Sequence, residues 1–225
     1  MNKKSKNRQA KNQQNPDKIP EFAFKFSNLF SKNYQIITTI LLLFPLVIYG
    51  QVWNFEFVWD DFQRAGTGHL HNPFVKNPSF SNFFQLFSQP YFGMYIPITY
   101  LFWGGLKAFA EFFSLPVSGV LHFTNVIIHI VNGLLVFTIL KNFISNKWAV
   151  LLGTLFFLLH PIQVETVAFI SEFRNLLAFC FSLSGLYFYL KNQARLDFLP
   201  LFLFILALLS KPSAAVLPLI IFAIN

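Results

Sequence analysis

Apolar runs recur along most of this chain, and they constrain its fold more than any other feature. The runs cover roughly residues 36–53, 120–140, 148–159, 176–190, 198–209 and 214–225. A helix needs about 20 apolar residues to cross a bilayer, so the shorter runs must recruit flanking residues or pack inside a bundle. Because only 12% of the residues are charged, against about 25% in soluble domains, we predict an all-α, polytopic transmembrane helix bundle.

Basic residues concentrate in the polar segment 1–33, before the first apolar run. With the N-terminus inside, twelve Lys and Arg residues fall on the inner side and five on the outer side, as the positive-inside rule requires. We therefore predict a largely disordered cytoplasmic tail over residues 1–33, which contacts anionic lipid rather than nucleic acid. The transmembrane domain then covers residues 34–225. The tail holds eight of the seventeen basic residues: Lys3, Lys4, Lys6, Arg8, Lys11, Lys18, Lys25 and Lys32.

A long mixed segment, residues 54–119, forms the first outer loop in this orientation and holds most of the acidic and histidine side chains. Its aromatic residues repeat at helical intervals over residues 80–87 and 96–113. We expect two helices there that lie in the membrane interface. Residues 96–113 could instead span the bilayer, but Gly104, Gly105, Lys107 and Glu111 disfavour that alternative.

Two adjacent carboxylates, Asp60 and Asp61, follow the first apolar run, with Arg64 close behind. Neighbouring carboxylates near a low-dielectric boundary repel each other, so at least one of them should be harder to ionise. That property suits a proton acceptor or a metal ligand. The alternative is an ordinary helix or turn cap in a solvated loop.

Residues 160–178 place His160, Glu165, Glu172 and Arg174 near the outer end of a predicted span. Were residues 165–174 one helix, Glu165 and Glu172 would share a side, whereas Glu172 and Arg174 would lie on different faces. Ionisable side chains that gather at one membrane face favour a functional site over solvated caps. Lys211, between the last two apolar runs, is either a snorkelling lysine or a phosphate ligand.

A polar stripe marks the second predicted span. Its members recur on one face of the helix, and we interpret them as partners in interhelical hydrogen bonds rather than as catalytic groups. They are His122, Asn125, His129 and Asn132.

Taken in order, five stretches resemble the transmembrane and tetratricopeptide-repeat mannosyltransferases and their bacterial relatives, which belong to the GT-C glycosyltransferase superfamily. The resemblance implies a GT-C-like membrane enzyme that moves a sugar from a polyprenyl-phosphate carrier to a hydroxyl of a protein or glycan on the outer side. The stretches are VWDD at 58–61, YIPITYLFW at 95–103, LHFTNVIIHIVNGLLVF at 121–137, HPIQVETVAFISEFRNLLA at 160–178 and SKPSAAVLPLIIF at 210–222.

The family's acidic pair maps onto Asp60 and Asp61, and its HP…E…R segment maps onto residues 160–174. We expect one aspartate to act as general base, with Arg174 and Lys211 stabilising the departing phosphate. The residues in supporting roles are His160, Glu165 and Arg64. The sequence identifies no cofactor, although a divalent cation such as Mg²⁺ or Mn²⁺ can bind an acidic pair, as in some superfamily members.

The chain departs from the family at EFRN (172–175) and KP (211–212), and it carries no tetratricopeptide repeats. Because it stops inside an apolar run, we expect an N-terminal fragment of a longer protein, from a bacterial inner membrane or an endoplasmic-reticulum membrane. The alternatives are a multi-pass transporter or flippase-like protein, which would carry charges at mid-helix, and a noncatalytic membrane scaffold.

Overall fold

The computed structural model describes residues 22–61, 68–192 and 197–224, so residues 1–21 of the predicted tail lie outside the described part. Within those ranges the chain is helical, and its one extended pairing is a bridge between Tyr91 and Met94. The elements are η1 (Phe26–Phe30), α2 (Gln35–Tyr49), η2 (Gly50–Asn54), η3 (Trp59–Asp61), η4 (His69–His71), α3 (Pro73–Lys76), α4 (Phe80–Ser88), α5 (Pro97–Phe112), α6 (Val117–Phe143), α7 (Lys147–Leu159), α8 (Gln163–Ala168), η5 (Ile170–Glu172), α9 (Phe173–Lys191), α10 (Phe198–Ser210), η6 (Pro212–Val216) and α11 (Leu217–Ile224).

Three helical stretches in the described ranges are long and apolar enough to cross a membrane: Gln35–Asn54, Val117–Phe143 and Ile170–Lys191. Lys147–Leu159, Phe198–Ser210 and Pro212–Ala223 are apolar but shorter. The prediction of an all-helical chain is therefore confirmed for the described residues, and three of its helices have the length and apolar character that spanning a membrane requires.

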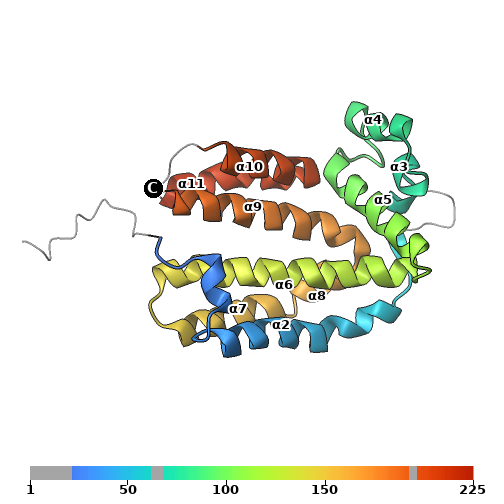
Figure 1. Ribbon diagram of the computed structural model, residues 1–225. Coiled ribbons are helices and arrows are strands. Elements are labelled where there is room, and N and C mark those ends of the chain that lie inside the picture. Colours follow the sequence, from blue (N-terminus) through green and yellow to red (C-terminus); the bar gives the residue numbers. More distant parts are fainter. Residues whose placement is uncertain (1–21, 62–67, 193–196, 225) are drawn as a thin grey trace, which may run out of the picture.

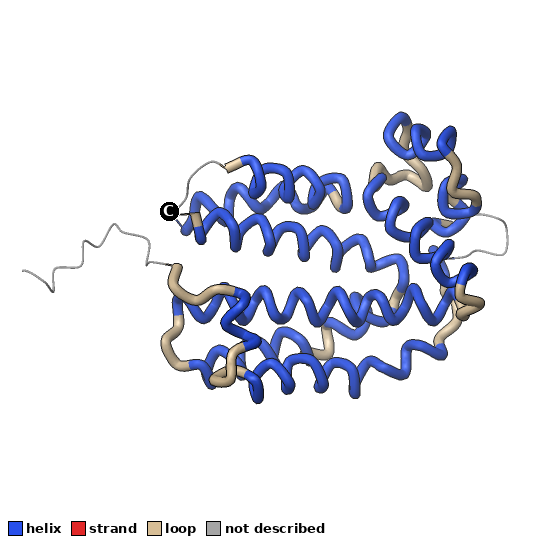
Figure 2. The backbone as a smooth tube through the Cα atoms, viewed as in Figure 1, coloured by secondary structure: helices blue, strands red, loops and turns tan. Residues whose placement is uncertain are grey.

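The 27-residue helix α6 lies at the centre of the bundle. It packs against α2, α7 and α9, and α10 covers the other side of α9 (Figure 1). Figure 2 shows that α3, α4 and α5 gather at one end, which we call the loop end. The opposite end, where residues 22–34 meet the C-terminal ends of α6 and α9, is called the tail end. There Asn142 bonds the backbone of Phe24.

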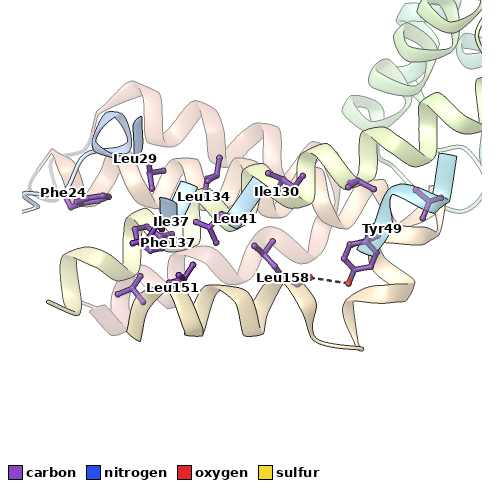
Figure 3. Close-up of a cluster of buried hydrophobic side chains, with 14 residues drawn as sticks. Phe24, Leu29, Ile37, Leu41, Tyr49, Ile130, Leu134, Phe137, Leu151 and Leu158 are labelled. Carbon is purple, nitrogen blue, oxygen red and sulfur yellow. Dashed lines mark hydrogen bonds between the residues drawn. The ribbon is translucent and has the colours of Figure 1, made fainter. Parts of the chain in front are cut away.

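A buried apolar cluster runs along α2, α6 and α7, from Phe24 at the tail end to Tyr49 toward the loop end (Figure 3). Residues 22–34 contribute to it, since Thr38 Oγ1 donates to Leu29 O at 2.7 Å and holds η1 against α2. Gly133 lets α6 approach α7 closely, because a Cβ at that position would stand 2.6 Å from Leu158 Cδ2. Small residues at such contacts are typical of packed membrane helices. The cluster includes Phe24, Leu29, Ile37, Leu41, Phe137, Leu151 and Leu158.

The polar stripe of α6 bonds backbone carbonyls of neighbouring segments, which confirms the interpretation as interhelical hydrogen bonding. Two of these carbonyls, on Leu158 and Phe169, lie where α7 and α8 end, so the stripe satisfies acceptors that a helix terminus leaves free. The bonds join His122 Nε2 to Glu56 O (3.3 Å), Asn125 Nδ2 to Phe169 O (2.8 Å), His129 Nε2 to Leu158 O (2.9 Å) and Asn132 Nδ2 to Leu176 O (3.0 Å).

Both helices expected in the outer loop form, as α4 and α5. Ser79 caps α4 by accepting a hydrogen bond from Asn82 N at 3.3 Å. On α5, Lys107 and Glu111 form the one-turn ion pair that their spacing suggests, with an N–O distance of 2.7 Å.

Residues 165–174 do not form one helix, so the side-chain faces considered for that case do not apply. Helix α8 ends at Ala168, Phe169 is extended, and α9 begins at Phe173. Tertiary hydrogen bonds replace the helical ones here. Asn125 Nδ2 donates to Phe169 O, and Ser171 N donates to the carboxylate of Asp61.

Candidate functional site

Arg174 occupies the first turn of α9 at the loop end, and its side chain is only 8% exposed. Its Nη1 lies 2.9 Å from His69 Nε2 and 3.1 Å from Met94 Sδ. Its Nη2 donates to Glu172 Oε1 at 3.2 Å. Within the described residues, the buried Nε has no hydrogen-bond partner, so one strong donor remains available for an anion.

His69 connects Arg174 to α5 through a chain of hydrogen bonds with a defined direction. A guanidinium can only donate, so His69 Nε2 must accept and the ring proton must lie on Nδ1. That proton is donated to Tyr100 Oη at 2.9 Å, and the Tyr100 hydroxyl donates in turn to Tyr91 O at 3.3 Å. The network requires a neutral His69.

Burial keeps His69 neutral. The ring is 1% exposed and lies against Phe92 and Trp103. Burial, with a further contribution from the charge of Arg174, lowers the pKa of His69 from 6.5 to about 4, while Asp60 acts in the opposite direction. The hydrogen-bond chain is therefore intact at neutral pH.

A tight turn, residues 91–94, contacts Arg174 through Met94 Sδ and His69 through the Phe92 ring. Tyr91 and Met94 exchange two backbone hydrogen bonds of 2.9 Å, and Phe92 (φ 50°) and Gly93 (φ 71°) both have positive φ. These are the features of a type I′ turn. A positive φ at a phenylalanine costs on the order of 1–3 kcal/mol, so packing must hold this turn in place.

Lys211, at the end of α10, reaches the same turn of α9 as Arg174 and bonds Asn175 Oδ1. Burial lowers the pKa of Lys211, the charge of Glu172 raises it, and the charge of Arg174 lowers it further. Thr99 Oγ1 fixes this junction by donating to Ser210 O at 3.0 Å. Two of the predicted residues, Arg174 and Lys211, are thus brought together around Glu172.

Asp61 ties the outer loop to the start of α9. Its Oδ1 accepts from Ser171 N at 2.9 Å and from Ser171 Oγ at 2.5 Å, and its Oδ2 accepts from Val58 N at 3.3 Å. The residue is fully buried, and burial raises the pKa of its carboxyl above 3.8 although these hydrogen bonds lower it. Asp61 is therefore the carboxyl of the pair that is harder to ionise. The leading cause is its burial and not repulsion by Asp60.

Asp60 directly precedes Asp61 in the chain and is only partly buried. It follows Trp59, which is 84% exposed and has a φ of 44°. The charge of Asp60 raises the pKa of His69, so Asp60 lies close enough to His69 for the two to interact electrostatically. Of the adjacent pair, Asp60 is the carboxylate that a bound molecule can reach.

An apolar cavity of about 390 Å³ runs along α9 beside this cluster. Its lining on α9 extends from Asn175 to Leu186, roughly 16 Å along the helix axis. Asn175, which bonds Lys211, stands at the loop end of this lining. The other walls include Gln163, Thr166, Phe157, Ser213, Leu217 and Ile220.

Of the three residues predicted to support the site, His160 and Glu165 do not join it in the structure. Arg64 lies outside the described residues. His160 caps the α7–α8 turn by accepting from Ile162 N at 3.2 Å, and Glu165 is exposed on α8. Within the described ranges there is no group of three or more His, Cys, Asp or Glu side chains that could hold a metal ion, and both oxygens of Asp61 already accept hydrogen bonds.

Sequence reasoning missed His69, Tyr100, Ser171 and Asn175. His69 and Arg174 are 105 positions apart, and Asp61 and Ser171 are 110 apart. The local spacing of these residues gives no sign of the pairing. The one available signal was that His69 shares the predicted outer loop with Asp60.

No family model, no curated protein and no solved structure matches this chain. The resemblance to GT-C mannosyltransferases therefore rests on the five sequence stretches alone.

Proposed function

We propose that this chain is a GT-C-like membrane glycosyltransferase, which moves a sugar from a polyprenyl-phosphate donor to a hydroxyl acceptor at the loop end. The observation that carries the proposal is that Lys211 bonds Asn175, which lines one end of the apolar cavity, and that Arg174 directly precedes Asn175 on α9. The two cations lie next to the lining and are not part of it. Cations at one end and an apolar wall along the rest suit an amphipathic anion such as a polyprenyl phosphate.

The donor phosphate would bind Arg174 and Lys211. The unpartnered Nε of Arg174 can donate to a phosphate oxygen without breaking its bonds to His69 and Glu172. A guanidinium suits phosphate geometry, and an ammonium adds a second positive charge. Negative charge develops on the phosphate oxygen as the bond to the sugar breaks, so the attraction between the phosphate and these two cations becomes stronger. The two cations therefore stabilise the transition state more than the bound donor.

The prenyl chain would lie in the cavity along α9. Apolar side chains form most of its wall, so a chain of isoprene units can pass from the bilayer into the cavity and exchange lipid contacts for protein contacts without exposure to water. Asn175 would mark the change from phosphate to hydrocarbon, because it both bonds Lys211 and lines the cavity.

Asp60 is our choice for the general base, with Asp61 as a structural anchor. In the proposed reaction Asp60 takes the proton of the acceptor hydroxyl, and the hydroxyl oxygen bonds the anomeric carbon. The bond between that carbon and the phosphate oxygen breaks, and its electron pair leaves with the polyprenyl phosphate. Asp61 cannot take this role without losing the hydrogen bonds that hold Ser171.

The proposal includes the predicted topology. The N-terminus is cytoplasmic, and the loop end faces the periplasm of a bacterial inner membrane or the lumen of the endoplasmic reticulum. Helices α4 and α5 would lie in the interface, where their exposed rings contact lipid. Those rings include Phe80, Phe84, Phe109 and Phe112.

The test measures transfer from a radiolabelled polyprenyl-phosphate mannose by the purified chain in lipid vesicles. Asp60→Asn should lower transfer by about 10²-fold or more, the usual contribution of a general base. Glu56→Gln is the matched control, because Glu56 is an exposed carboxylate in the same loop. Equal transfer by the wild type and Asp60→Asn would refute the catalytic role, and no transfer by the wild type from mannosyl or glucosyl donors would refute the function.

A further inference from the structure

A second cavity, of about 430 Å³, opens at the tail end between residues 25–27, α6 and α9. The segments that line it, residues 25–27 and the C-terminal part of α9, lie at the opposite end of the bundle from the first turn of α9 (Figure 1). Lys25 and Lys191 stand at its rim, and both are exposed. Among the described residues that line this cavity there is no carboxylate.

The polarity of the tail-end cavity changes with depth. On α9, Ser184 lies roughly 10 Å deeper than Lys191 along the helix axis. Val131 and Leu135 of α6 form an apolar wall. A ligand that fits carries negative charge at one end and hydrocarbon at the other.

Residues 25–27 and α9 are already joined at the rim of the cavity. Phe26 N donates to Tyr187 Oη at 3.2 Å, so the Tyr187 hydroxyl keeps its own proton for another acceptor. Lys191 Nζ lies 5.9 Å from the centre of the Tyr187 ring and 5.6 Å from that of Phe188. These cation–π contacts hold the ammonium over the opening.

We infer that the tail-end cavity binds one anionic glycerophospholipid, with its phosphodiester between Lys25 and Lys191 and the start of an acyl chain against Val131 and Leu135. Charge complementarity selects this occupant, because the predicted inner leaflet carries anionic headgroups. The Tyr187 and Ser184 hydroxyls can donate to its phosphate and ester oxygens. The inference uses the proposed orientation, with the tail end at the inner leaflet, and is independent of glycosyl transfer.

The test is native mass spectrometry of the whole chain in detergent, titrated with phosphatidylglycerol or with phosphatidylcholine. The wild type should retain phosphatidylglycerol in preference, and Lys25→Gln with Lys191→Gln should weaken that binding about fivefold or more. Lys32→Gln with Lys141→Gln is the matched control, since it removes the same charge at the same end outside the cavity. Ser184→Leu, which fills the cavity without a change of charge, should also weaken binding.

Two results would overturn the inference. One is equal retention of phosphatidylglycerol and phosphatidylcholine by the wild type, which would exclude recognition of charge. The other is an equal loss in the two double variants, which would assign binding to the general charge of the tail end. Neither result depends on sugar transfer, so this proposal and the proposed function fail separately.

Discussion

Acid should destabilise this protein through His69. The ring is buried and accepts a hydrogen bond from Arg174, and its pKa falls from 6.5 to about 4 on folding. Between these values the unfolded chain binds a proton that the folded chain does not, so the free energy of unfolding decreases as pH falls. At about 1.4 kcal/mol for each pH unit, the loss reaches about 3 kcal/mol between pH 6.5 and pH 4.

His69→Gln separates this effect from other titrations. The glutamine oxygen can accept from Arg174 and its amide can donate to Tyr100, so the network survives without a titrating ring. Unfolding in mixed micelles, followed by tryptophan fluorescence from pH 8 to pH 4, gives the free energy of both proteins. The difference between them should be constant from pH 7 to pH 8 and should then change by about 3 kcal/mol toward pH 4. Parallel pH profiles down to pH 4 would refute the assigned burial and tautomer.

Two further predictions concern the packing of α6. Gly133→Ala should destabilise the fold by about 1–3 kcal/mol because its Cβ meets Leu158, and the cost should shrink in the background of Leu158→Ala. Gly153→Ala, on α7 with nothing within 4 Å of its Cβ, is the control, and an equal cost at both glycines would contradict the close contact. Asn132→Leu removes the bond to Leu176 O and should lower the free energy of unfolding in micelles by about 0.6–1.7 kcal/mol; an unchanged value would show that this bond adds nothing.

Local periodicity was sufficient to predict several parts of this fold. The apolar runs predicted the helices, and the amphipathic pieces of the outer loop predicted α4 and α5 within a residue or two. The stripe on α6 was also predictable, because polar residues on one face of an apolar helix need partners from neighbouring helices. Each of these inferences depends on residues within a few turns of one another.

The candidate site depended on contacts that no local pattern describes. Asp60 and Asp61 are adjacent in sequence, yet the hydrogen bonds to Ser171 bury Asp61 and leave Asp60 accessible. Residues 165–174 are not one continuous helix, and Glu172 meets Arg174, whereas one helix would have placed the two on different faces. The sequence determined which segments are helical and apolar, because those properties follow from neighbouring residues. Only the tertiary structure decided which ionisable groups are buried, paired or reachable, because desolvation and hydrogen bonding depend on segments more than a hundred residues apart.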